Sequence, residues 1–198
     1  MKGRISVVLA VVVLLALVGG CKNETSDTAA VRKAPEFTLR SFDGKEVSLS
    51  AYRGKVVVLE WLNTDCPFVL YHYESAKTMV SLAAKYKDVV WLAINSTNST
   101  DVKTNLDFAS RHKITYPILD DRDGKVGRAY AAKTTPHMFV IDAEGNIVYD
   151  GAIDNAPMGS AKGEKINYVD EALAAISSGK VVNIESSKPY GCNVKYAN

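Results

Sequence analysis

A cysteine followed at once by proline is the feature of this sequence with the clearest chemical potential. Cys66 stands in the stretch NTDCPFVLYHY, residues 63–73, after an apolar run. A cysteine thiolate is a nucleophile toward disulfides and peroxides. A redox motif of two cysteines separated by two residues needs its second cysteine at position 69, but Val69 stands there. Any second sulfur must therefore come from elsewhere in the chain.

The N-terminus carries a targeting signal. A short basic region precedes an apolar run of 14 residues, 5–18, which ends in two glycines and Cys21. The run is shorter than the ~20 residues of a transmembrane helix and is typical of a signal peptide, although an uncleaved anchor is the alternative. The Gly-Gly-Cys ending resembles the lipobox of bacterial lipoproteins. By that resemblance residues 1–20 are a lipoprotein signal peptide and Cys21 is lipidated, so the protein is exported and anchored in the bacterial cell envelope, facing the periplasm.

Composition and charge predict one ordinary globular domain behind this signal. The chain has 198 residues, of which 47% are hydrophobic, and a formal net charge of +2. Without the two basic residues of the signal, 22 basic residues face 22 acidic ones, so the charge balance gives no support for a nucleic-acid partner. Residues 21–33 are polar and predict a flexible tether. We expect the folded domain over 34–180 and a C-terminal tail over 181–198.

Cysteine usage leaves a single candidate pair. The chain has 3 cysteines, and lipidation takes Cys21. Cys66 and Cys192 remain, in a compartment where disulfides persist.

Alternating apolar runs and helical periodicities predict an α/β fold. β-branched runs at 55–62 and 89–95 are typical of strands buried on both faces. Alternating residues within 37–49 and 137–153 predict β-hairpins, and apolar residues at helical spacing predict helices. The expected order is a hairpin, a β-α-β-α-β unit, a short helix, a second hairpin and a last helix over 166–178. Such an order predicts an α/β sandwich with a mixed central β-sheet.

Cys66 falls where the first buried strand leads into its helix. At a helix N-terminus a thiolate faces unpaired backbone N–H groups, which lower a thiol pKa from ~8.5 to between ~3.5 and ~7.5. Pro67 suits the first helical position, where its missing N–H costs nothing. The alternative is a buried, inert cysteine. The position favours the reactive nucleophile.

Two stretches carry a resemblance to a known family. Residues 35–68, PEFTLRSFDGKEVSLSAYRGKVVVLEWLNTDCPF, and 134–151, TTPHMFVIDAEGNIVYDG, resemble redoxins of the alkyl hydroperoxide reductase/thiol-specific antioxidant (AhpC/TSA) superfamily. The likeness covers about residues 34–178. It implies a thioredoxin-like three-layer sandwich with an N-terminal hairpin extension, no cofactor and no metal, and a cis-proline at Thr135-Pro136 that faces the cysteine.

Departures from the family pattern favour its peroxiredoxin-like branch. Thioredoxins and membrane-anchored thiol reductants carry C-x-x-C. Typical peroxiredoxins carry a threonine at the position of Asn63 and an arginine at that of Pro136, and both residues help to stabilise peroxide. NTDCPFV and the terminal GCNVKY, residues 191–196, resemble motifs of the peroxiredoxin-like branch instead. The second motif implies that Cys192 is a resolving cysteine.

We therefore predict a thiol–disulfide oxidoreductase in which Cys66 is the nucleophile and Cys192 resolves. The supporting residues expected around them are Trp61, Asn63, Asp65, Pro67, Thr135 and Pro136. The alternative for the pair is a permanent structural disulfide, which could contribute ~4–5 kcal/mol by closing so long a loop. The expected partners are thiol or disulfide proteins or a peroxide, an electron donor that the sequence does not identify, and the membrane.

Other readings of the same residues stay open. A peroxiredoxin-like antioxidant peroxidase would use the same cysteines, with peroxide oxidising Cys66 first. A copper carrier on a thioredoxin fold would use Cys66 with His137, although it lacks the second helix cysteine of such carriers. Glu60 and Asp65 could relay protons to Cys66, and the tail tyrosines are expected to pack.

Overall fold

The computed structural model describes residues 32–197. The predicted signal peptide, the lipidation site Cys21 and most of the tether lie outside the described residues. Within 32–197, no helix is long and apolar enough to span a membrane.

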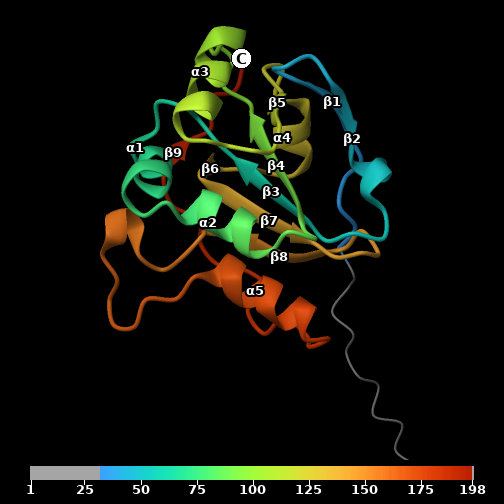
Figure 1. Ribbon diagram of the computed structural model, residues 1–198, viewed down its shortest axis with the longest axis vertical. Coiled ribbons are helices and arrows are strands. Elements are labelled where there is room, and N and C mark those ends of the chain that lie inside the picture. The colour runs from blue at the N-terminus through green and yellow to red at the C-terminus, as the bar shows by residue number, and fades with distance from the viewer. Residues whose placement is uncertain (1–31, 198) are drawn as a thin grey trace, which may run out of the picture. The chain divides into compact units, whose positions relative to one another are not determined.

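A seven-stranded mixed sheet forms the centre of the domain, in the order β2-β1-β5-β4-β3-β7-β8 (Figure 1). Strands β3, β4 and β5 run parallel, and the remaining pairs are antiparallel. The strands are β1 (Thr38–Ser41), β2 (Glu46–Ser48), β3 (Val57–Trp61), β4 (Val90–Asn95), β5 (Ile118–Asp120), β7 (His137–Ile141) and β8 (Ile147–Gly151). Both predicted hairpins and the predicted mixed α/β sheet are confirmed.

Five helices are described between and after these strands. They are α1 (Pro67–Leu70), α2 (Thr78–Lys85), α3 (Val102–Arg111), α4 (Lys125–Ala129) and α5 (Tyr168–Ser177), and α5 runs along β7 and β8 (Figure 1). Single 3-10 turns add Leu49–Tyr52 and Pro157–Gly159. Helical spacing after Pro67 predicted helical structure there. This structure consists of α1, a π-helical turn, Tyr71–Ser75, and α2, which Lys77, with φ +52°, separates from the turn.

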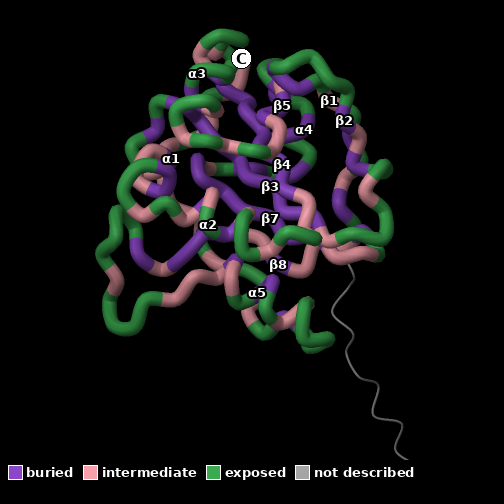
Figure 2. Tube along the Cα trace, viewed as in Figure 1, coloured by how far each residue is buried: buried purple, intermediate pink, exposed green. Residues whose placement is uncertain are grey.

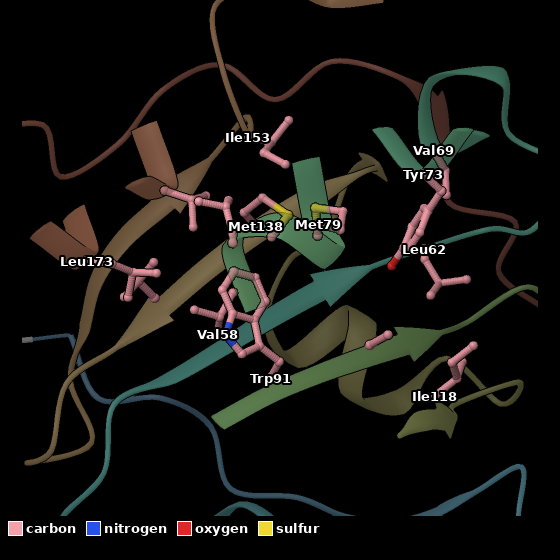
Figure 3. Close-up of a cluster of buried hydrophobic side chains, with 14 of the residues drawn as sticks. Val58, Leu62, Val69, Tyr73, Met79, Trp91, Ile118, Met138, Ile153 and Leu173 are labelled. Carbon is pink, nitrogen blue, oxygen red and sulfur yellow. The ribbon is translucent and has the colours of Figure 1, made fainter. Parts of the chain in front are cut away.

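Two hydrophobic clusters cover the two faces of the sheet, which explains why β3 is buried along its whole length (Figure 2). Alternate residues of β3 point to opposite faces, so Val58 belongs to one cluster and Val57 to the other. The first cluster lies under α2, α3 and α5 and is shown in Figure 3. The second lies under α4 and the 3-10 turn Leu49–Tyr52.

Both ends of the described chain are paired with the body of the domain. The Ile147 N–H donates to the Arg32 carbonyl at 2.8 Å, and the Ala34 N–H donates to the Gly145 carbonyl at 3.0 Å. At the other end, β9 (Cys192–Asn193) pairs antiparallel with β6 (Thr134–Thr135) as a separate two-stranded sheet. The sequence pattern predicted no strand after the last helix. The expected tail is therefore part of the fold.

Candidate active site

Cys66 lies at the junction that the sequence predicted. It is the N-cap residue of α1, with extended backbone angles (φ −77°, ψ +120°), and Pro67 takes the first turn. The Cys66 N–H donates to the Asn63 carbonyl at 3.1 Å, and the Cys66 carbonyl accepts from the Leu70 N–H at 2.9 Å. These bonds fix the side chain at the positive end of the helix. The residue is only 1% exposed.

The segment around Pro136 lies against the Cys66 sulfur. The Thr135–Pro136 peptide bond is cis, as the family resemblance implied. The Cys66 thiol donates to the Thr135 carbonyl oxygen, with 2.9 Å between the two heavy atoms. The cis-proline segment and the cysteine, 69 residues apart in sequence, therefore share one site.

The C-terminal tail places Cys192 opposite Thr135, the residue whose carbonyl contacts Cys66. In the β6–β9 register Thr135 pairs with Cys192 and Thr134 pairs with Asn193 (the red tail beside β6 in Figure 1). Thr135 thus contacts Cys66 through its carbonyl and has Cys192 as its strand partner. Cys66 and Cys192 are both free thiols in this structure, the first buried and the second half-buried.

Gly191 allows this close approach. It has a φ of +129°, a conformation that favours glycine, and a Cβ built there would lie 2.1 Å from the Thr135 carbonyl oxygen. The glycine before Cys192 in the sequence is the signal for this contact.

The site lowers the pKa of one thiol and raises the pKa of the other. Burial raises the pKa of Cys66, but hydrogen bonding from the Cys192 and Thr135 side chains stabilises its thiolate. Backbone N–H groups of Val69 and Cys192 add to this, and the resulting pKa of Cys66 lies below that of an ordinary thiol. Burial and the adjacent Cys66 raise the pKa of Cys192 to about 11. Cys66 is therefore the thiol prepared to react as a thiolate.

The last residues of the tail are fastened to α4. The Tyr196 hydroxyl donates to the Ala132 carbonyl at 2.8 Å, and the Arg128 guanidinium lies 4.8 Å from the centre of the Tyr196 ring. A Cβ at Gly127 would lie 2.6 Å from this ring, so glycine is needed for the contact. The prediction that Tyr196 packs agrees with this position.

Val69 shows what replaces the second cysteine of a C-x-x-C motif. It is fully buried and lies beside Tyr73 and Leu62 in the first hydrophobic cluster (Figure 3). The position serves packing beneath α1.

Most of the other residues predicted to support the site lie close to Cys66 in the structure. Pro67, Thr135 and Pro136 lie at Cys66, and Asn63 shapes the preceding turn because its Oδ1 accepts the Asp65 N–H at 2.9 Å. The Asp65 side chain itself is exposed.

Trp61 is fully buried in the second cluster, where its ring packs against Tyr130 and Phe139. Its Nε1–H donates to Ser96 Oγ at 3.1 Å. The structure therefore places Trp61 in the packing behind the active-site loop, on the opposite face of the sheet from the cluster that contains Cys66.

Glu60 is an ionisable group buried in the central strand. It is 1% exposed and accepts a hydrogen bond from the Tyr73 hydroxyl at 2.6 Å, while its second oxygen has no hydrogen-bond partner among residues 32–197. The Tyr73 hydroxyl also lies 3.0 Å from that of Tyr116. Burial raises the pKa of Glu60 to about 8. The run at 55–62 predicted a strand buried on both faces, but it did not show which hydrogen-bond partner a buried Glu60 would have.

We expect Glu60→Gln to flatten the dependence of stability on pH. The folded state holds a proton on Glu60 up to about pH 8, whereas an unfolded glutamate loses it near pH 4.5. The stability that Glu60 contributes is therefore fully present below about pH 4.5 and is lost as pH rises through about 8. Glutamine keeps the shape without the charge. Urea unfolding of both proteins from pH 5 to pH 8 measures this, with the exposed Glu46→Gln as control. An unchanged slope in Glu60→Gln contradicts the assignment.

His137 lies in β7 beside Trp61, on the second face of the sheet, with its ring 4.6 Å from that of Phe139. Its Nδ1 accepts the Lys133 N–H at 3.2 Å, and burial lowers the pKa of His137 to about 4. Within residues 32–197 no three His, Cys, Asp or Glu side chains gather as a metal-binding group. The copper alternative, with Cys66 and His137 as ligands, stays a prediction.

A cysteine at a helix N-terminus, opposed by a cis-proline segment beside a mixed sheet of this order, defines a thioredoxin-like redox protein. The model of the AhpC/TSA family matches residues 30–150, more than half of the chain. The chain belongs to the AhpC/TSA family.

Proteins similar to this chain include thiol-disulfide oxidoreductases and proteins of solved structure. Thiol-disulfide oxidoreductase ResA of Geobacillus thermodenitrificans is 32% identical over 125 residues, which cover 63% of this chain and 70% of the relative. An uncharacterized conserved protein from Geobacillus kaustophilus has a solved structure with a TM-score of 0.76 and 26% identity, covering 84% of this chain and 92% of that one.

A secreted Mycobacterium tuberculosis disulfide oxidoreductase shares the fold, with a TM-score of 0.50 and 24% identity over 56% of this chain and 79% of its own. The family membership and the relatives named thiol-disulfide oxidoreductases identify the chain as a redox enzyme.

Proposed function

We propose that this protein is an exported, lipid-anchored thiol–disulfide oxidoreductase with Cys66 as nucleophile and Cys192 as resolving cysteine. The observation that carries the proposal is the shared position of the two thiols. Thr135 accepts the Cys66 S–H through its carbonyl and pairs with Cys192 in the β6–β9 register. The similarity to relatives named thiol-disulfide oxidoreductases supports the reaction class.

The reaction follows from thiol–disulfide exchange. The Cys66 thiolate attacks one sulfur of a substrate disulfide, forms a mixed disulfide and expels the other substrate sulfur as a thiolate. Cys192 then loses its proton to solvent and attacks the Cys66 sulfur. This step forms Cys66–Cys192 and releases the second substrate thiolate. The substrate disulfide is reduced, and the two cysteines are oxidised.

The difference in acidity suits a cycle in which an electron donor then reduces the pair. Cys192 is half-buried, whereas Cys66 is 1% exposed, so a donor thiolate has better access to the Cys192 sulfur. Attack there expels Cys66, whose lowered pKa makes it the better leaving group. The donor is a dithiol, small or carried by a second redox protein: its second thiolate attacks the mixed disulfide on Cys192, so the donor leaves as a disulfide and both cysteines are reduced.

The trapping experiment replaces Cys192 with serine. We expect Cys192→Ser to accumulate mixed disulfides on Cys66, because the step that releases them is lost while the first attack remains. Non-reducing peptide mapping before and after oxidation identifies them, and the Cys66→Ser, Cys192→Ser double variant is the matched control. If the wild-type protein never forms Cys66–Cys192 under any oxidising condition, the proposed mechanism fails.

A second candidate, a peroxiredoxin-like antioxidant peroxidase, is favoured by the burial of Cys66. A site that is 1% exposed admits a small oxidant more readily than a protein disulfide. Peroxide would convert the Cys66 thiolate to a sulfenic acid with loss of water or alcohol, and Cys192 would displace water to form the disulfide. Asn63 argues against high efficiency, since its side-chain oxygen is used in the turn before Cys66. The ratio of second-order rate constants for peroxide and for a disulfide peptide separates the two functions.

Export and lipid attachment through Cys21 are supported by the apolar run and the glycines before this cysteine. Metabolic labelling with radioactive palmitate tests them: the wild-type chain incorporates label in the membrane fraction, and Cys21→Ala does not. Label that persists in Cys21→Ala contradicts this attachment site.

A further inference from the structure

Tyr190, two residues before Cys192, reaches into a buried polar network. Its hydroxyl donates to Asp154 Oδ1 at 2.5 Å and lies 2.8 Å from His72 Nε2. His72 and Asp154 are each 1% exposed. The second nitrogen of His72 lies 3.1 Å from the Thr78 hydroxyl. A tail residue thus completes hydrogen bonds of two side chains that water does not reach.

The proton positions in this network follow from the number of hydrogens. The single Tyr190 hydroxyl hydrogen goes to Asp154, so the Tyr190 oxygen accepts from His72, and the His72 hydrogen is on Nε2. His72 Nδ1 then accepts from the Thr78 hydroxyl. Burial lowers the pKa of His72, in agreement with a neutral ring of this tautomer. The Ala156 N–H gives Asp154 Oδ1 a second donor at 2.9 Å, and Lys165 lies 4.0 Å from Oδ2.

The network joins the two segments that carry the cysteines. His72 lies in the helical turn that follows α1, six residues after Cys66, and Tyr190 belongs to the tail. The Tyr190 ring also packs on Phe68 of the CPFV motif, with 5.9 Å between ring centres. Tyr190 and Cys192 both pack against the cluster that contains Cys66. The contacts of Tyr190 therefore connect the helical segment that follows Cys66 to the tail strand that carries Cys192.

We propose that Tyr190 is a positioning residue for the resolving step: its hydroxyl, held between Asp154 and His72, places Cys192 so that it attacks a mixed disulfide on Cys66. This inference rests on the proposed thiol–disulfide function.

The Tyr190 hydroxyl makes hydrogen bonds that the packing of the ring cannot replace. Phenylalanine would occupy the same place against Phe68, but it would leave the buried Asp154 and His72 each short of a hydrogen-bond partner. Such unpaired buried groups are costly, and the tail would shift or hydrate to avoid them. Its displacement moves Cys192 and removes the support of Cys192 for the Cys66 thiolate, while Cys66 keeps its hydrogen bonds with Asn63, Leu70 and Thr135.

Two-step kinetics with dithiobis-nitrobenzoate, an aromatic disulfide whose thiolate product absorbs visible light, test this. The first thiolate is released when Cys66 forms the mixed disulfide, and the second when Cys192 resolves it. Cys192→Ser cannot resolve the mixed disulfide and should show the first phase alone. Cys66→Ser should lose that phase, which shows that it arises from Cys66. We expect Tyr190→Phe to slow the second phase about tenfold, on the scale of one lost buried hydrogen bond, and to leave the first phase within about twofold.

Two comparisons separate positioning from a general loss of stability. Tyr196→Phe removes the hydroxyl of another tail tyrosine, which donates to the Ala132 carbonyl, and is expected to leave the second phase within about twofold. His72→Gln, which keeps an N–H for Tyr190, is expected to resolve faster than His72→Leu. Equal second phases in Tyr190→Phe and wild type, measured where both are folded, overturn the inference. Release of only one thiolate by the wild type would instead contradict the proposed function.

Discussion

Replacement of Cys66 by serine is expected to lower disulfide-exchange turnover by at least about 1,000-fold, on the scale seen when a catalytic nucleophile is removed. The serine hydroxyl is scarcely ionised at neutral pH and forms no disulfide. The fold should persist, because serine is a favourable N-cap residue and Cys66 occupies the N-cap of α1. Steady-state reduction of a disulfide peptide and the thermal unfolding midpoint, measured on the same preparations, provide the comparison.

The informative contrast is with Cys192→Ser. Cys66→Ser should form no mixed disulfide, whereas Cys192→Ser should form one and stop there. Substantial turnover in Cys66→Ser would mean that Cys192, the half-buried thiol, is the nucleophile. That outcome would reverse the roles that the lowered pKa of Cys66 and the raised pKa of Cys192 assign.

Replacement of Gly191 by alanine should detach β9 from β6. The new Cβ would lie 2.1 Å from the Thr135 carbonyl oxygen, and the φ of +129° is unfavourable for any residue with a side chain. Backbone strain of this kind costs about 1–3 kcal/mol, and relief of the clash requires the strand to move. We expect formation of the Cys66–Cys192 disulfide to slow at least tenfold, because displaced sulfurs lose their proximity. Quenched alkylation of free thiols after oxidation measures the rate.

Gly163→Ala is the matched control for Gly191→Ala. Gly163 also has a positive φ, +92°, but a Cβ there meets no atom of the described part of the chain within 4 Å. It therefore carries the conformational strain without the collision at the site. If both variants form the disulfide at the same rate, the close approach of Gly191 to Thr135 has no part in bringing the thiols together.

The sequence by itself determined the sheet and the place of the nucleophile. Runs of β-branched residues predicted β3 and β4, because strands covered on both faces must be apolar throughout. The position of Cys66 followed from those predictions, since a strand must end before its helix begins and Pro67 marks the first turn. Cysteine counting supplied Cys192 as the one remaining candidate partner.

Only the tertiary structure decided how the tail meets that nucleophile. Strand β9 has two residues, too few for a periodic pattern, and its register with β6 depends on a contact across 57 residues of sequence. The same holds for Tyr190, whose partners His72 and Asp154 come from separate elements. Local patterns record which face of an element is apolar. Hydrogen bonds between distant segments depend on how the whole chain packs, and this packing brings the second sulfur, absent at Val69, to Cys66 from the tail.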